Sequence, residues 1–114
     1  MRRLFPLALV MLAGCKSPYI EATIHNATGT TIHTLQIEYP SASFGTQTLA
    51  PDADFHYRFK IQGEGKMKLT YTAANHQDIK STGPTLYEGQ SGTLTLTLPA
   101  ASDPQWQLAV TPTH

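Results

Sequence analysis

The stretch FHYRFKI, residues 55–61, indicates the fold class because apolar and polar side chains alternate along its whole length. Successive side chains of a β-strand point to opposite faces, so such alternation predicts a strand that is buried on one face. The apolar set would face a protein interior and the polar set would face solvent: Phe55, Tyr57, Phe59 and Ile61 inward, and His56, Arg58 and Lys60 outward.

The same two-residue period recurs along the chain, and no segment carries a sustained helical stripe. Strands are expected at 19–25, 31–39, 66–73, 93–98 and 106–110, with weaker ones at 44–49 and 76–80. Ile32 is out of phase with Leu35, Ile37 and Tyr39, which indicates a β-bulge near His33.

Turn-forming residues separate these segments. They lie at 26–29, 40–41, 51–52, 63–65, 83–84, 89–92 and 103–104. One-sided alternation is typical of antiparallel sheets, whereas parallel sheets are usually buried on both faces. The sequence therefore predicts an all-β fold, a single antiparallel β-sandwich of seven or eight strands over residues 19–114.

This spacing of short strands resembles the immunoglobulin and fibronectin type III class of sandwich. The resemblance is architectural, because the chain lacks the Cys…Trp…Cys arrangement of antibody domains and its one tryptophan, Trp106, is near the end. The stretch ASFGTQTLAPDADFHYRFKI, residues 42–61, is similar to segments of small bacterial lipoproteins, a family that implies no specific activity.

The first fifteen residues have the build of a secretory signal peptide. Two arginines precede the apolar run LFPLALVML, residues 4–12, and small residues follow it. That run is about half of the ~20 residues that a membrane-spanning helix needs.

The apolar run leads into LAGC, residues 12–15, which resembles the lipobox of bacterial lipoproteins at all four positions. The resemblance implies cleavage between Gly14 and Cys15 and lipid attachment to the Cys15 sulfur, the only cysteine of the chain. Lys16 follows, where aspartate would favour inner-membrane retention, so an outer-membrane location facing the periplasm is expected. Residues 1–14 would be the signal peptide and 15–18 the lipidated end and short tether.

Composition argues against several partners and cofactors. The 114 residues carry eight basic and eight acidic side chains, so nothing resembles the basic footprint of a nucleic-acid-binding protein. Removal of residues 1–14 would take away two arginines and leave an acidic excess of two. One cysteine cannot form an internal disulfide or a Cys-rich zinc site, and we expect no cofactor.

Two groups of residues could bind something. If residues 25 and 33 lie opposite each other in a hairpin turning at Thr28 and Gly29, then His25 and His33 could form a weak metal site, although ordinary surface histidines are the simpler interpretation. If the strands on either side of 63–65 pair, four basic side chains share one face: Arg58, Lys60, Lys66 and Lys68. That face could dock an acidic envelope protein or an anionic glycan.

No acid, base and nucleophile stand together in a catalytic pattern. We therefore expect a non-enzymatic, membrane-anchored lipoprotein that serves as an interaction or structural module of the cell envelope. The alternative is a ligand-binding module for a glycan or a metal ion.

Overall fold

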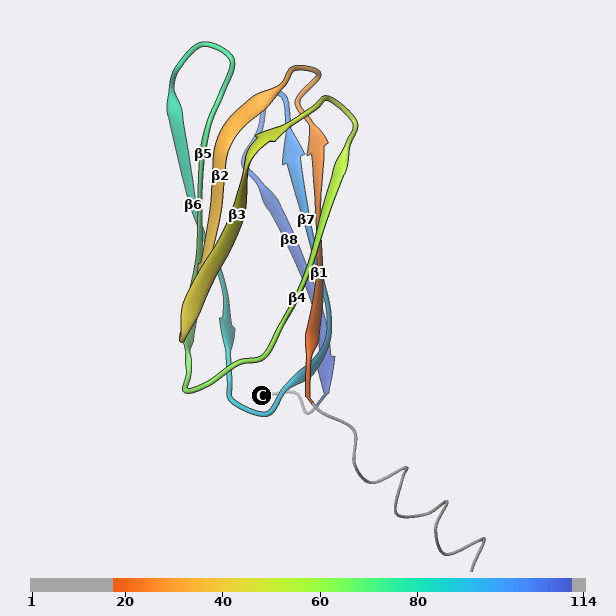
Figure 1. The fold of residues 1–114 in the computed structure, drawn as a ribbon, viewed down its shortest axis with the longest axis vertical. Helices are drawn as coiled ribbons and strands as arrows, with labels where there is room; N and C mark the ends of the chain where they lie inside the picture. Colours follow the sequence, from red (N-terminus) through yellow and green to blue (C-terminus); the bar gives the residue numbers. More distant parts are fainter. Residues whose placement is uncertain (1–17, 112–114) are drawn as a thin grey trace, which may run out of the picture.

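The computed structural model describes residues 18–111, which form eight strands and no helix. The strands pack as two four-stranded sheets, as Figure 1 shows. They are β1 (Ile20–Ala27), β2 (Ile32–Tyr39), β3 (Ala42–Leu49), β4 (Asp54–Phe59), β5 (Gly65–Thr72), β6 (Asp78–Leu86), β7 (Ser91–Pro99) and β8 (Gln105–Thr111). The predicted all-β sandwich is confirmed at this level.

One sheet, sheet A, has the order β4-β1-β7-β8, and the other, sheet B, has the order β3-β2-β5-β6. The expectation of purely antiparallel sheets is wrong, because β1 pairs with β7 in parallel along the whole length of β1. Two parallel strands need a crossover connection, and here β2 to β6 supply it. The parallel pair keeps the one-sided alternation, since β1 and β7 are each covered on one face only.

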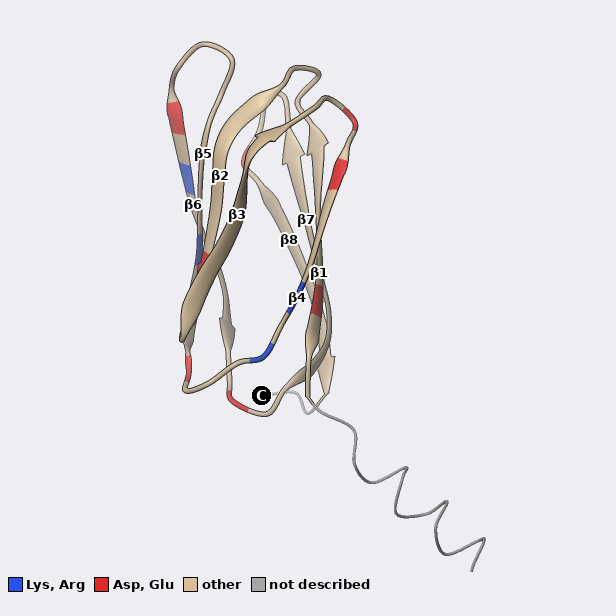
Figure 2. Ribbon diagram, viewed as in Figure 1, with Lys and Arg blue, Asp and Glu red and all other residues tan. Residues whose placement is uncertain are grey.

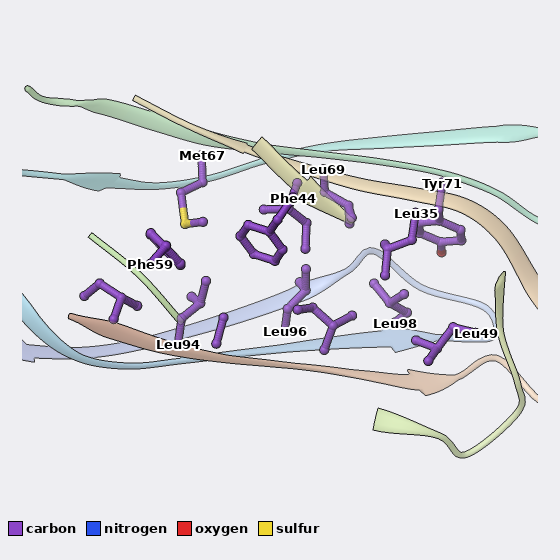
Figure 3. Close-up of a cluster of buried hydrophobic side chains, with 14 of the residues drawn as sticks. Leu35, Phe44, Leu49, Phe59, Met67, Leu69, Tyr71, Leu94, Leu96 and Leu98 are labelled. Atoms are coloured by element: carbon purple, nitrogen blue, oxygen red, sulfur yellow. The ribbon is translucent and has the colours of Figure 1, made fainter. Parts of the chain in front are cut away.

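In β1, β2, β5 and β7 the predicted apolar set lies between the sheets (Figure 3). In β7, for example, three leucines are buried and the threonines between them are exposed or half-buried. The buried set also includes Ile20, Ala22, Ile24, Leu35, Ile37, Phe59, Ile61, Met67, Leu69 and Tyr71. The predicted bulge in β2 is present, because its pairing with β5 shifts register between His33 and Gln36. Thr34 within it has a φ of 51°.

Two hairpins that the site predictions required do not form. Each connection crosses from one sheet to the other: β1 lies in sheet A and β2 in sheet B, and β4 lies in sheet A and β5 in sheet B. A short connection with turn residues allows either a hairpin or a crossing between sheets. Here both connections are crossings, because β1 pairs with β4 and β2 pairs with β5.

A turn was expected at Gly83 and Pro84, but both residues lie inside β6. The two of them stand opposite Met67 alone, where the pairing of β5 with β6 shifts register. Pro84 is accommodated because β6 is an edge strand and a bulge needs no regular ladder bond from its nitrogen.

The two open sides of the sandwich are closed differently. Between β3 and β4, five rings pack together in what we call the aromatic seam: Tyr39, Phe44, Phe55, Tyr57 and Phe59. Between β6 and β8, Trp106 lies over Gly83 and donates a hydrogen bond of 3.0 Å from Nε1 to Ser81 Oγ, a contact that we call the tryptophan seam. Tyr57, expected inside, is 40% exposed, because β4 is an edge strand and its ring covers Phe44 from outside.

Candidate functional site

The four basic side chains proposed as one binding face are divided between the two sheets (Figure 2). Arg58 lies on β4, with its Nη1 3.6 Å from Glu21 Oε2 and its guanidinium 4.5 Å from the Tyr19 ring centre. Lys60 follows β4, whereas Lys66 and Lys68 lie on β5 in sheet B. A shared face required β4 and β5 to pair, so this part of the sequence interpretation is wrong.

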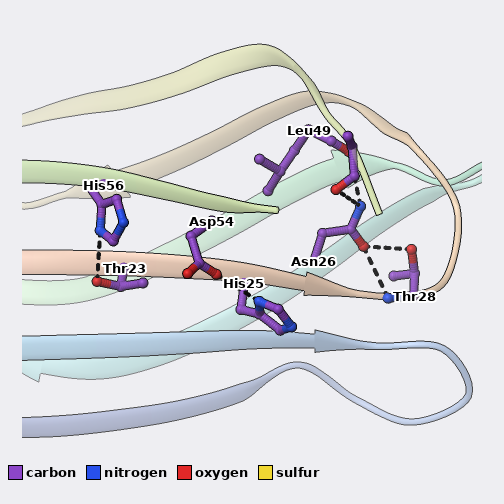
Figure 4. Close-up of polar contacts among 8 residues, drawn as sticks. Thr23, His25, Asn26, Thr28, Leu49, Asp54 and His56 are labelled. Atoms are coloured by element: carbon purple, nitrogen blue, oxygen red, sulfur yellow. Dashed lines mark hydrogen bonds and ion pairs between the residues drawn. The ribbon is translucent and has the colours of Figure 1, made fainter. Parts of the chain in front are cut away.

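His25 and His33 are also in different sheets, so they are not cross-strand neighbours. His25 Nδ1 lies 2.6 Å from Asp54 Oδ1 across β1 and β4 (Figure 4), whereas His33 lies opposite Thr48 and Thr72 in sheet B. Within residues 18–111, no three His, Cys, Asp or Glu side chains are arranged to hold a metal ion.

Cys15 and Gly14, the predicted lipidation and cleavage residues, lie outside the described residues. Across the part of the chain that the structure describes, no helix is long and apolar enough to span a membrane.

Asn26, at the end of β1, organises the loops at one end of the sandwich. Its side chain is fully buried, and Nδ2 donates to the carbonyl oxygens of Thr30, Leu49 and Ala50 at 2.7 to 3.1 Å. Its Oδ1 accepts from the Thr28 backbone N–H at 3.0 Å and from the Thr28 hydroxyl at 2.6 Å (Figure 4). A buried amide with all these partners fixes the β1–β2 turn against the end of β3.

An open pocket of about 500 Å³ lies at this end of the sandwich, beside the turn that Asn26 fixes. Its floor is formed by the ends of strands, at Ile32, Tyr71 and Ile79. Its walls come from the β1–β2 turn, the β5–β6 loop and the β7–β8 loop: Thr28, Thr30, Ala73, Ala74, Asn75, Gln77 and residues 99–104. The volume is within the range of small-molecule sites.

Tyr71 is the buried polar residue of this pocket. It is 4% exposed, and Figure 3 shows its ring extending from β5 toward the opposite sheet with the hydroxyl oxygen at the tip. Among residues 18–111 the Tyr71 hydroxyl has no hydrogen-bond partner. In the same region, every polar side-chain atom that is fully enclosed has a partner, so the Tyr71 oxygen is not fully enclosed. The Tyr71 oxygen is therefore reached from the pocket. Burial raises the pKa of the phenol further above neutral pH, so the hydroxyl is protonated there, as in an ordinary tyrosine.

The rim of the pocket carries one charge of each sign, from Lys80 on β6 and Asp103 on the β7–β8 loop. Sequence reasoning missed this pocket because its residues come from three connections that are distant in the chain. The one local signal was the stretch PAASDPQ, residues 99–105, whose two prolines mark an irregular connection long enough to form a wall.

No known protein family matches this chain, and no curated protein and no solved structure matches it either.

Proposed function

We propose that this protein is a lipid-anchored, non-catalytic binding module of the bacterial cell envelope, which binds its partner at the loop end of the sandwich. The anchor is Cys15, supported by the lipobox and by the apolar run before it. One acyl chain holds a protein only marginally at a membrane, and the two or more chains of such an anchor hold it stably. With Lys16 after the cysteine, the proposal places the protein at the outer membrane, facing the periplasm.

The observation that carries this proposal is the position of the pocket relative to the point where the chain enters the sandwich. β1 begins at Ile20, five residues after Cys15, and ends at Ala27 beside the pocket residue Thr28. Eight residues of extended strand span about 26 Å. With Cys15 at the membrane, the loop end would therefore point away from the lipid surface, where a partner can reach it (Figure 1).

We also propose that the sandwich belongs to the immunoglobulin-like class. Two four-stranded sheets with three hairpins and several crossings between the sheets are consistent with that architecture. Domains of this class often bind through loops that cluster at one end, as the pocket loops do here.

The second candidate function is a small-ligand module, and the pocket with its buried Tyr71 hydroxyl favours it over a purely structural role. The ligand would then be an envelope glycan. A metal ion is less favoured, since His25 and His33 are on different sheets.

Two measurements in cells test the proposal. Cys15→Ala should move the protein from the membrane fraction to the soluble fraction, and a variant that still sediments with membranes would contradict the anchor. A photo-crosslinking residue at Ser102, in the pocket wall, should give a recurring adduct. The same residue at Gln107, on the outer face of β8, should give none, and equal adducts at both positions would contradict binding at the loop end.

A further inference from the structure

We propose that the pocket at the loop end binds a neutral saccharide of one or two rings, with the Tyr71 hydroxyl as the hydrogen-bond donor at its floor. This inference rests on the proposed function, because it names the ligand of the same site. The observation that supports it is a different one: Tyr71 is almost wholly buried, and its unpartnered hydroxyl opens into a pocket of about 500 Å³.

A buried hydroxyl is normally hydrogen-bonded, because leaving one without a partner costs free energy. Two other polar side chains of the lining already have partners within the protein: Thr28 Oγ1 donates to Asn26 Oδ1, and the Asn75 side chain bonds with Gln77. The Tyr71 hydroxyl is open to the pocket, so a ligand oxygen at the floor can accept its hydrogen bond in place of solvent.

The charges around the pocket favour a ligand without net charge. Lys80 and Asp103 are the only formally charged lining residues, and their charges cancel. An anion would gain from Lys80 but be repelled by Asp103, and the reverse holds for a cation. Hydroxyl groups can accept from the ammonium and donate to the carboxylate, so both side chains can make charge-assisted hydrogen bonds to a saccharide.

The neutral polar groups of the lining point to the same class. Hydroxyls and amides both donate and accept hydrogen bonds, as the hydroxyl groups of a saccharide do. They alternate with small aliphatic surfaces that can pack against the C–H face of a sugar ring. The polar lining residues are Thr28, Thr30, Asn75, Gln77 and Ser102, and the aliphatic ones are Ala73, Ala74, Pro99, Ala100, Ala101 and Pro104.

A peptide fits this site less well. Extended peptides usually bind by adding a strand to an open sheet edge. The pocket instead lies among connecting loops and the ends of strands: its floor residues Tyr71 and Ile79 are cross-strand partners in β5 and β6. β6 is an edge strand, but most of the pocket lining comes from the connecting loops and not from this edge.

The test is a titration of the full-length chain in detergent with cellobiose and with N,N′-diacetylchitobiose, followed by amide chemical shifts. We expect saturable shifts at the pocket loops for at least one disaccharide. Tyr71→Phe removes only the oxygen and should weaken binding by roughly three- to tenfold, the effect of one hydrogen bond. The matched control is Tyr39→Phe, which removes a hydroxyl in the aromatic seam and should leave the affinity unchanged.

A second variant keeps the test sharp. Ala101 is an exposed residue of the pocket wall, so Ala101→Phe should occlude the pocket without disturbing the core, and it should abolish the shifts. The inference is overturned if neither disaccharide gives saturable shifts up to its solubility limit, or if Tyr71→Phe binds as tightly as the natural chain. It is also overturned if the dipeptide Ala-Ala saturates the same resonances more tightly, since that outcome assigns the pocket to peptides. Failure here, with the Ser102 adduct retained in cells, would reject the saccharide and leave the proposed function standing.

Discussion

The aromatic seam and the tryptophan seam close the same sandwich on opposite sides, but they do so by different means. In the aromatic seam, five rings contact one another at centroid distances of 4.3 to 6.2 Å. In the tryptophan seam one ring suffices, because Gly83 leaves room for it and Ser81 orients its indole N–H. The first seam therefore depends on shared apolar area, and the second depends on one close fit and one hydrogen bond.

This difference has a consequence for tolerance to mutation. Each ring of the aromatic seam has at least one other ring as a neighbour, so loss of an outer ring leaves the inner ones packed. The tryptophan seam has no such redundancy, because a single added carbon at Gly83 would meet the indole. Large losses are thus expected from removing volume in the first seam and from adding volume in the second.

The largest effect is expected from Phe59→Ala in the aromatic seam. Phe59 is 3% exposed and contacts both Tyr39 and Phe44. Removal of a buried ring leaves a cavity, and we expect a loss of about 3–5 kcal/mol in the free energy of unfolding, measured by chemical denaturation. Tyr57→Ala in the same seam should cost only about 0.5–1.5 kcal/mol, since its ring is 40% exposed and mainly stacks on Phe44. Equal losses would show that the seam is not layered as described.

Gly83→Ala, at the tryptophan seam, should give the next largest loss in the free energy of unfolding. A Cβ at this position would lie 2.6 Å from Trp106 Cε3, so the indole or the backbone has to move. We expect a loss of about 1–3 kcal/mol together with a red shift of tryptophan fluorescence. Gly65→Ala is the matched control in sheet B, because its Cβ would meet Pro40 at 3.6 Å, an ordinary contact. If Gly83→Ala leaves both stability and emission unchanged, the close fit does not hold.

Ser81→Ala separates the hydrogen bond from the fit at the tryptophan seam. The indole Nε1–H would lose its acceptor at 3.0 Å while Gly83 stays in place. A loss of about 0.5–1.5 kcal/mol is expected by denaturation, with little change in emission wavelength. Thr82→Ala, one residue further along β6 and exposed, serves as the control and should stay within about 0.5 kcal/mol of the natural chain.

The smallest effect should come from alkaline pH, and of the two seams only the aromatic one should respond. Burial, and then the charge of a neighbouring Tyr57 phenolate, raise the pKa of Tyr39 above its ordinary value. The folded chain therefore holds this proton more tightly than the unfolded chain. Its contribution to stability is complete below the ordinary tyrosine pKa and is lost as pH rises through the raised one.

Melting temperatures of the natural chain and of Tyr39→Phe should accordingly converge or cross as pH rises above the ordinary tyrosine pKa, because the variant lacks this titration. Tyr19→Phe, outside the aromatic seam, is the control for general alkaline effects. A constant difference between the natural chain and Tyr39→Phe at all pH values would contradict the expected proton linkage.

Much of the strand pattern could be predicted from particular residues. In β1, β5 and β7 the apolar residues of the alternating pattern are buried as expected. The bulge in β2 was indicated by Ile32, which is out of phase with the apolar residues after it. The predicted turn at Gly83 and Pro84 was wrong. These residues end a strand only where every position must make regular ladder hydrogen bonds. On an edge strand they form a bulge instead.

The candidate site was beyond the reach of such reasoning. Tyr71 was correctly expected to face inward, but nothing local to it indicates that its hydroxyl opens into a pocket whose walls also come from the distant β1–β2 and β7–β8 connections. Asn26 resembled a turn residue in the sequence, and only its contacts with Leu49 and Ala50 make it the fixed point of the loop end.

The sequence by itself determined where most strands lie and, in β1, β5 and β7, which face is apolar, because alternation is a property of neighbouring residues and of the geometry of the extended chain. Tertiary structure alone decided which strands pair. It sent β1 and β2 to different sheets, separated His25 from His33, and divided Arg58 and Lys60 from Lys66 and Lys68. Pairing depends on burying all apolar faces at once, so it is settled by the whole core.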